Sequence, residues 1–278
     1  MDAKTLQGWL GQHQLGVAAH YLNTAVYDCE VYICGVEILA DGQLILEFRK
    51  GHQFQIGDLM TIHLDNRTGV SEYDASLNVY RCSYKGEIVQ IQPNRVRVAP
   101  VEYQLFWGME IVLHYQQPGY QFPQDDRVEQ ALPDTSLTEL PEFDLREQEN
   151  KIGVLVSYAL ERPHTTVLAF LSSDEDDIFF ITLPQTFKAK LLRRQSRCYF
   201  AIDSRAVFTY SEAIEWNYSL IAADAYQIPA THPLFEPIKE AFIAKNPWEV
   251  GFFSDPSIEM YHLKAQHVVC PGHALSQE

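Results

Sequence analysis

The stretch Ile178-Phe-Phe-Ile-Thr182-Leu-Pro-Gln-Thr186-Phe-Lys188-Ala-Lys190-Leu-Leu-Arg193-Arg194-Gln-Ser-Arg197 decides how the second half of this chain is interpreted. Its apolar start, 178–181, predicts a short buried strand, and a basic amphipathic helix is predicted to begin near Thr186. The first turn of a helix presents N–H groups and a positive dipole end, which favour an anion. With the Thr186 hydroxyl and the Lys188 charge, the pattern fits a phosphate site. The simpler alternative is an N-cap threonine before a solvated basic helix, which is the commoner arrangement.

The segments on either side of this stretch narrow the choice. A turn precedes the strand Arg162-Pro-His-Thr165-Thr166-Val167-Leu-Ala-Phe170, and Cys198-Tyr-Phe-Ala-Ile202 and 218–228 predict further strands. This succession resembles the FMN-binding split β-barrel family, the pyridoxamine 5′-phosphate oxidase-like proteins, over roughly residues 152–270. In that family a strand ending in Thr precedes a Ser/Thr-x-Lys turn, a helix and an Asn-Pro-Arg-Val-like step. Here Ser196 stands where Pro is usual, and Ala223 stands where Gly is common.

The resemblance implies an FMN-binding homodimer with the flavin held between subunits. Its phosphate would be held by Thr186 and Lys188, with Lys190 as a second cation. The residues implied along the ring, the ribityl chain and the interface are Thr165, Thr166, Val167, Thr182, Asn217 and Tyr218. Phe187 replaces the Arg of the oxidase's Ser-Arg-Lys turn, and its C-terminal Arg-x-His step is absent. Both departures argue against pyridoxamine phosphate oxidase activity itself.

Two classes of function follow from this resemblance. One is a flavin-dependent oxidoreductase acting on a small molecule that the sequence does not identify, with no protein nucleophile or metal. The other is a non-catalytic flavin- or haem-binding or regulatory protein, whose N-terminal β-domain serves as a partner or ligand module. Bound flavin would favour either flavin version over an empty barrel, and turnover of NAD(P)H would then select the enzyme.

Composition limits the other possibilities. The chain has 278 residues, of which 46% are hydrophobic, and its 21 basic against 37 acidic residues give a net charge of −16. Such a charge argues against a nucleic-acid or anionic-membrane binder, although a local phosphate pocket remains compatible with it. The chain contains no apolar run of ~20 residues, no signal-like start and no CxxC pair among its five cysteines. We therefore expect a reduced, cytoplasmic protein.

The predicted fold is mainly β, in two domains. Residues 1–116 are expected to form a small antiparallel β-barrel or sandwich, led by a helix within 1–24 and containing a hairpin at Asp41-Gly42. Residues 117–150 are rich in proline and acidic side chains, which predicts an extended connector with a helical turn near 135–150. Residues 151–278 form the predicted split barrel, with an amphipathic helix over 232–245 and a strand over 258–263.

Several residues near the C-terminus could suggest a metal site: His262, His267, Cys270 and His273. Strand alternation is expected to put His262 and His267 on opposite faces, and a terminal position accounts for His273. The Cys270-Pro271 pair resembles haem-responsive Cys-Pro pairs, but a single dipeptide is a weak signal. Core or surface positions are therefore expected, without a metal.

Overall fold

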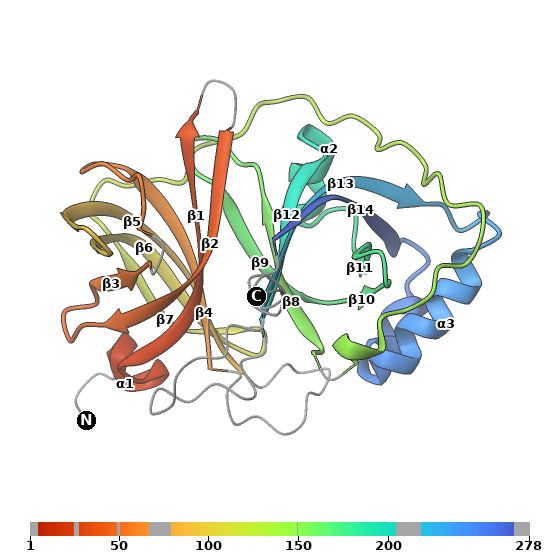
Figure 1. The fold of residues 1–278 in the computed structure, drawn as a ribbon, viewed down its shortest axis with the longest axis horizontal. Helices are drawn as coiled ribbons and strands as arrows, with labels where there is room; N and C mark the ends of the chain where they lie inside the picture. The colour runs from red at the N-terminus through yellow and green to blue at the C-terminus, as the bar shows by residue number, and fades with distance from the viewer. Residues whose placement is uncertain are drawn as a thin grey trace, which may run out of the picture. The chain divides into compact units, whose positions relative to one another are not determined.

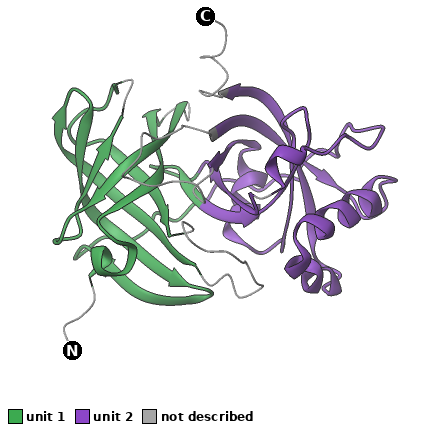
Figure 2. Ribbon diagram, turned by 60° about the horizontal axis from the view of Figure 1, so that its bottom comes forward, with its two compact units in different colours: residues 1–125, 159–165, 204–215 green, residues 126–158, 166–203, 216–278 purple. Residues whose placement is uncertain are grey.

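The computed structural model describes residues 5–24, 28–48, 51–66, 79–148, 150–203 and 218–269. As predicted, the fold is mainly β with few helices, and it contains two seven-stranded sheets. The chain divides into two compact units (Figure 2). The first contains the described residues of Met1–Asp125 and Ala159–Thr165, and the second those of Asp126–Tyr158, Thr166–Asp203 and Trp216–Glu278.

The first unit is built on a sheet with the order β3-β2-β1-β4-β5-β6-β7 (Figure 1). Its strands are β1 (His13–Asn23), β2 (Asp28–Ile38), β3 (Leu44–Glu47), β4 (Leu59–Asp65), β5 (Tyr80–Gln92), β6 (Arg95–Trp107) and β7 (Glu110–Gln116). An additional antiparallel pairing of β3 with β6 joins the two sides of the sheet, which gives a barrel, one of the two forms that the regularly spaced short strands predicted. The core inside it consists mainly of aliphatic side chains from alternate strand positions.

The prediction of a helix within residues 1–24 is largely wrong. Only α1 (Leu6–Leu10) is helical: the Thr5 hydroxyl caps it by accepting from Gly8 N, and Gly11 ends it at a φ of +86°. The strand β1 follows at once. Seven consecutive residues of β1 are buried, because both of its faces are covered, so the period-2 alternation of a half-exposed strand is absent from its sequence.

The hairpin at Asp41-Gly42 is confirmed, since β2 pairs with β3 from Ile38↔Leu44 onward. From the sequence alone, two separate strands are expected at 77–84 and 86–92. The structure instead has one continuous strand, β5, with a bulge between Lys85 and Gly86. A glycine in a strand often marks such a bulge, so the break that the sequence suggested is a local bend.

The second unit is built on a sheet with the order β10-β11-β14-β13-β12-β8-β9. Its strands are β8 (Ile152–Ser157), β9 (His164–Ala169), β10 (Leu171–Ser172), β11 (Ile178–Thr182), β12 (Arg197–Asp203), β13 (Tyr218–Ile228) and β14 (Glu259–Val269). The helices α2 (Phe187–Arg194) and α3 (Phe235–Lys245) and the 3-10 helices η1 (Leu145–Glu147) and η3 (Pro247–Ser254) complete it. The strands β9, β11, β12, β13 and β14 and the helices α2 and α3 lie where the sequence predicted them, whereas β10 and η3 were not predicted.

Gly153 in β8 marks a close approach in this sheet. A Cβ there would lie 2.4 Å from Cε1 of Phe200, which is fully buried, and 3.0 Å from the carbonyl oxygen of Ala201. We predict that Gly153→Ala lowers the free energy of unfolding by about 2 kcal/mol, because the ring must move within a packed core. Denaturant titration measures this. Gly251→Ala is the control, since nothing lies within 4 Å of its Cβ position, and equal stability of the two variants would contradict the prediction.

The segment predicted as a connector, 117–150, has little regular structure. Gln117 N donates to Val101 O in the first unit, and the boundary between the units falls after Asp125. From there the segment follows the second unit through backbone hydrogen bonds: Gln130 N to Arg193 O, Thr135 N to Gln227 O, and Asp144 N to Ser172 O. Residues 126–148 and 150 therefore form part of the second unit's structure.

Candidate functional site

The site suggested by the sequence lies in the second unit, where β11 leads into α2. β11 is buried along its whole length and ends at Thr182, as predicted. A turn through Pro184 follows, and α2 begins after Thr186. The apolar side of α2, which consists of Ala189, Leu191 and Leu192, packs into the unit, so its polar residues remain on the other side.

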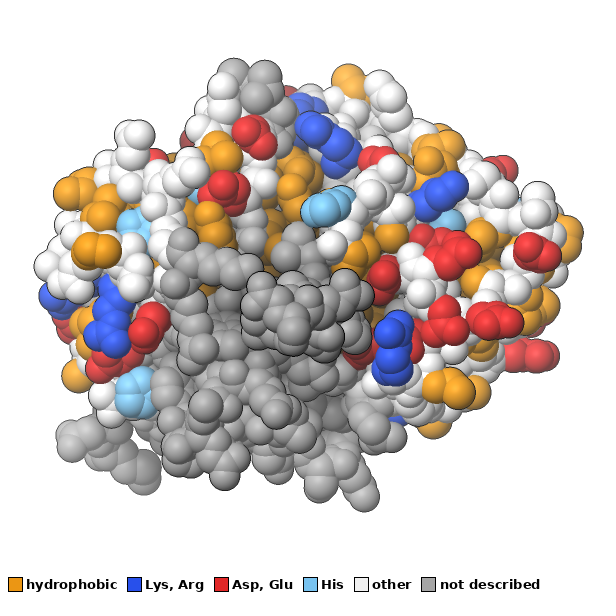
Figure 3. Space-filling view, viewed as in Figure 1, with side chains coloured by type: hydrophobic (Ala, Val, Ile, Leu, Met, Phe, Trp, Pro, Cys, Tyr) orange, Lys and Arg blue, Asp and Glu red, His pale blue; other side chains and the backbone are white. Residues whose placement is uncertain are grey.

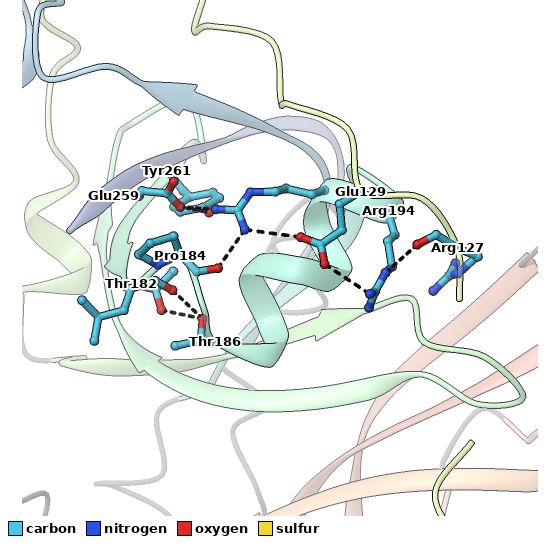
Figure 4. Close-up of polar contacts among 10 residues, drawn as sticks. Arg127, Glu129, Thr182, Pro184, Thr186, Arg194, Glu259 and Tyr261 are labelled. Carbon is cyan, nitrogen blue, oxygen red and sulfur yellow. Dashed lines mark hydrogen bonds and ion pairs between the residues drawn. The ribbon is translucent and has the colours of Figure 1, made fainter. Parts of the chain in front are cut away.

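The hydroxyls of Thr182 and Thr186 lie 3.1 Å apart (Figure 4). Thr186 has the extended backbone of an N-cap residue, but its side chain makes no cap hydrogen bond. Its hydroxyl instead donates to Leu183 O at 2.9 Å and can therefore accept from Thr182. The first turn of α2 thus starts without the side-chain acceptor that usually caps a helix.

Lys188 and Lys190 lie in the first turns of this helix and are partly exposed. Lys188 is close enough to Glu249 of η3 to influence its titration. Burial raises the pKa of the Glu249 carboxyl, while Trp248 and Lys188 act to lower it. An anion bound at the start of α2 would therefore share the Lys188 charge with Glu249.

The end of α2 carries two arginines, and the first of them, Arg193, holds the turn before the helix in place (Figure 4). Arg193 donates from Nη1 to Pro184 O at 2.8 Å and from Nη2 to Glu259 Oε2 at 2.7 Å. The Tyr261 hydroxyl donates to the same oxygen of Glu259 at 2.6 Å. Arg193 therefore joins the turn before α2 to β14. This positioning role was missed from the sequence, because Glu259 is 66 residues away from Arg193 and no local pattern marks it.

Arg194 anchors the segment after Asp126 on the same helix. Its Nε donates to Arg127 O at 2.9 Å, and its Nη2 lies 3.2 Å from Glu129 Oε1. Both arginines of the basic helix thus bind groups of the protein itself. The positive charge that an external anion could use at α2 comes from the lysines.

The other residues that were predicted to contact the flavin lie outside the turn before α2. Thr165 belongs to the first unit and is buried, and its Oγ1 has no hydrogen-bond partner in the part of the chain that the structure describes. Thr166 and Val167 continue β9 in the second unit. Tyr218 begins β13, but its side chain and all of Asn217 lie outside the described residues. The structure therefore brings together Thr182, Thr186 and the two lysines.

Both ring nitrogens of His262 are hydrogen-bonded to buried side chains of the second unit. Its Nδ1 lies 2.8 Å from Thr135 Oγ1 and its Nε2 lies 2.9 Å from Asp177 Oδ2. Hydroxyl, imidazole and carboxylate occur in the order used for nucleophilic catalysis, but all three side chains are buried and Thr135 Oγ1 also accepts from Leu137 N. His267 is exposed, while Cys270 and His273 lie outside the described residues. Within the described ranges no group of three or more His, Cys, Asp or Glu side chains could hold a metal.

Charge and hydropathy agree with the composition. On the face in Figure 3, acidic side chains gather on the right-hand side of the view. No helix in the described part of the chain is long and apolar enough to cross a membrane.

No protein-family model matches the chain, and no curated protein sequence matches it. Solved structures with a similar fold over part of the chain include the heme storage protein HutZ of Vibrio cholerae. It is 16% identical with a TM-score of 0.38, and the match covers 45% of this chain and 88% of that one. A putative pyridoxamine 5′-phosphate oxidase from Listeria innocua is 19% identical with a TM-score of 0.36, covering 46% and 94%.

A protein of unknown function from Agrobacterium tumefaciens is 16% identical with a TM-score of 0.37. That match covers 44% of this chain and 51% of the other. Similar structures thus include pyridoxamine 5′-phosphate oxidase-like and heme-binding proteins, each at low identity and over less than half of this chain. At these TM-scores the matches carry no argument about a ligand, which must come from the chain's own residues.

Proposed function

We propose that this protein binds FMN and is a flavin-dependent oxidoreductase acting on a small molecule. The observation that carries the proposal is the start of α2, where Thr186 occupies the N-cap position without capping the helix and sits 3.1 Å from the Thr182 hydroxyl. Two lysines follow within four residues. A phosphate would supply the missing acceptor at this helix end.

Each residue has a part in holding the phosphate. The first turn of α2 contributes its dipole, and Lys188 contributes a charge that its neighbour Glu249 shares. Thr186 would exchange its hydrogen bond to Leu183 O for one to a phosphate oxygen. Arg193, through Pro184 O and Glu259, keeps the turn in a fixed geometry. Such prior positioning lowers the entropy lost on binding.

The flavin supplies the redox chemistry when bound, and the protein binds and orients it. Following the resemblance, we assign Thr166 and Val167 of β9 to contacts along the ring and ribityl chain, with a homodimer completing the site. The cysteines resolved in the structure are buried thiols, and burial raises the pKa of Cys82 and Cys198. Such thiols are unreactive, which suits a protein of the reducing cytoplasm.

The test concerns Lys188. We expect Lys188→Ala to weaken FMN binding about ten- to hundredfold, because a charge-assisted contact worth roughly 1.5–3 kcal/mol is lost. Riboflavin lacks the phosphate and should bind the unmodified protein and the variant equally. Flavin fluorescence titrations of both ligands measure the difference. The matched control is Lys264→Ala, an exposed lysine on β14 of the same unit.

Equal FMN affinity before and after the substitution would reject Lys188 as the phosphate anchor, and a colourless protein that binds neither flavin would reject the proposal as a whole. Steady oxidation of NAD(P)H by the flavin-loaded protein would show that it is an enzyme and not only a flavin-binding protein. Reduction without turnover would support the alternative, a non-catalytic flavin- or haem-binding regulatory protein whose N-terminal unit serves as a partner or ligand module.

A further inference from the structure

The sheet of the first unit ends in a strand with an unpaired edge. At one end of the strand order, β3 is paired with β6, which closes the barrel. At the other end, β7 pairs with β6 on one side, and no described strand lies on its other side. Such an edge presents a row of backbone N–H and C=O groups that can pair with another chain.

The hydrogen bonds between β6 and β7 show which groups of β7 point outwards. Gln117 N donates to Val101 O at 2.8 Å. This bond flanks the opposed residues Glu102 and Gln116, where the register is regular, because the bulge of β7 lies nearer its start. Hydrogen-bonded and non-hydrogen-bonded pairs alternate in an antiparallel ladder, so Gln116 and His114 direct their backbone groups away from β6. Within the described ranges these groups have no hydrogen-bond partner.

Three stacked tyrosines lead from the barrel interior to this edge. The ring centroids of Tyr84 and Tyr103 lie 5.7 Å apart, and those of Tyr103 and Tyr115 lie 5.3 Å apart, with interplanar angles of 5° and 19°. Tyr84 is fully buried, whereas Tyr115 is 37% exposed. The stack therefore ends on the edge strand in a ring that can still pack against another aromatic side chain.

The sequence around Tyr115 suits a second copy of the same chain. The chain has a net charge of −16, so two copies repel each other over most of their surface. Residues 113–117, Leu-His-Tyr-Gln-Gln, contain no acidic side chain, and they also lack the lysine or proline that commonly protects an edge. Antiparallel pairing about Tyr115 puts His114 of one copy opposite Gln116 of the other. The outward-pointing residues then face each other, with no like charges opposed.

Large apolar side chains are exposed on the same hairpin. Trp107 is 37% exposed, Met109 86% and Ile111 52%. Single exposed apolar residues are normal, but these three lie within five residues beside an open edge and add apolar area to a contact there. A pairing of this length is smaller than a standard interface, so we expect a weak association.

We propose that β7 of the first unit pairs antiparallel with β7 of a second copy, symmetrically about Tyr115. His114 of each copy exchanges backbone hydrogen bonds with Gln116 of the other, and the two Tyr115 rings lie side by side across the axis. The interface is isologous, because the same patch serves both copies. It involves the first unit only and is independent of the homodimer proposed for the second.

Analytical ultracentrifugation of the full chain tests this proposal. We expect an association that increases with protein concentration and strengthens with added salt, because salt screens the repulsion between two chains of net charge −16. Tyr115→Lys should weaken it about ten- to hundredfold, because the paired rings are lost and like charges face each other across the axis. Any homodimer formed through the second unit should persist in this variant. Val89→Lys changes an exposed apolar residue of β5 and should leave the association unchanged.

His114→Pro is a second variant, because it removes an outward N–H and leaves the tyrosine stack intact. It should weaken the association about tenfold, since the N–H is lost from both copies. Amide hydrogen exchange locates the contact: exchange at His114 and Gln116 should slow as the protein concentration rises, whereas Leu113 and Tyr115, which bond to β6, should exchange slowly throughout.

Two results would overturn the proposal. An association that persists in both variants, with unchanged exchange at His114 and Gln116, would place the interface elsewhere on the chain. A mass that is independent of protein concentration and equal in the unmodified chain and Tyr115→Lys would mean that a second copy does not cover this edge.

Discussion

Replacing Lys245 with methionine is expected to stabilise the protein by about 2–3 kcal/mol below pH 7, and by less as the pH rises. Lys245 ends α3 and is 3% exposed. Its Nζ lies 3.7 Å from the centroid of the Phe170 ring and has no hydrogen-bond partner among the described residues. Burial lowers the pKa of the Lys245 amine to about 7, against an ordinary value of 10.5. Glu147 and Asp144 act to raise the pKa and Lys151 to lower it.

The direction of the pH dependence follows from proton binding. Between pH 7 and 10.5 the unfolded chain binds a proton at Lys245 and the folded chain does not, so the free energy of unfolding rises with pH in this window. Below pH 7 both states are protonated and the full penalty of the buried charge is present. This penalty is on the order of 4–5 kcal/mol, and attraction to the Phe170 ring offsets on the order of 2 kcal/mol.

Denaturant titrations at pH 6, 8 and 10 measure the effect. The advantage of Lys245→Met should be largest at pH 6 and should shrink towards pH 10. Lys239→Met is the matched control, because Lys239 lies on the same helix near the ring of Phe253 but has Glu236 as an ion partner at 3.0 Å. Its effect should stay within about 0.5 kcal/mol. A Lys245→Met variant less stable than the unmodified protein at pH 6 would show that the amine is favourably bound.

The elements of the second unit were predictable because each has a complete local signal. The apolar run 178–181, Thr182, Pro184 and the basic helix after Thr186 follow one another within 20 residues, and the structure has them in that order. The hairpin at Asp41-Gly42 is a similar case, since its turn residues mark it directly.

Elements covered on both faces were harder to predict. The strand β1 contains glycine and two alanines among apolar residues, and it is buried without alternation, so its spacing is compatible with a helix. At Gly86 a bulge interrupts the pattern while β5 continues, which made one strand resemble two.

Residues that act through distant partners gave no signal at all. Arg193 looked like one more basic residue of a helix, but its partner Glu259 is on β14. Arg162 is a similar case: its sequence neighbours suggest an ordinary turn, and only the structure shows that its guanidinium is buried and forms no ion pair with any described residue. Local sequence patterns carry information about periodicity and turns, whereas pairing across tens of residues depends on the fold.

The opposite result to that at Lys245 is expected for Asp177, a buried charged group whose hydrogen bonds are satisfied. Its carboxylate accepts from His262 Nε2 at 2.9 Å and from Ala265 N at 2.8 Å. With Nε2 as donor, Nδ1 of His262 accepts from the Thr135 hydroxyl. The segment 133–135 is also held to β13 by two backbone hydrogen bonds, from Thr135 N to Gln227 O and from Gln227 N to Pro133 O. Asp177→Ala should lower the free energy of unfolding by about 3–4 kcal/mol, because it leaves the buried His262 ring N–H and the partly buried Ala265 N–H unpaired.

Denaturant titration and amide hydrogen exchange test this together. Asp177→Asn keeps an acceptor oxygen and should lose about half as much stability, while Glu175→Ala, an exposed acid of the same turn, should stay within about 0.5 kcal/mol. Exchange at the Thr135 and Gln227 amides should accelerate in Asp177→Ala, since His262 no longer holds Thr135 in place. Unchanged exchange there, with a stability loss as small as that of Glu175→Ala, would mean that the chain of hydrogen bonds through His262 does not support the segment along the second unit. The two substitutions in the second unit are thus expected to change the free energy of unfolding in opposite directions. Lys245→Met removes a buried charge without hydrogen bonds and should stabilise the protein, whereas Asp177→Ala removes a hydrogen-bonded one and should destabilise it.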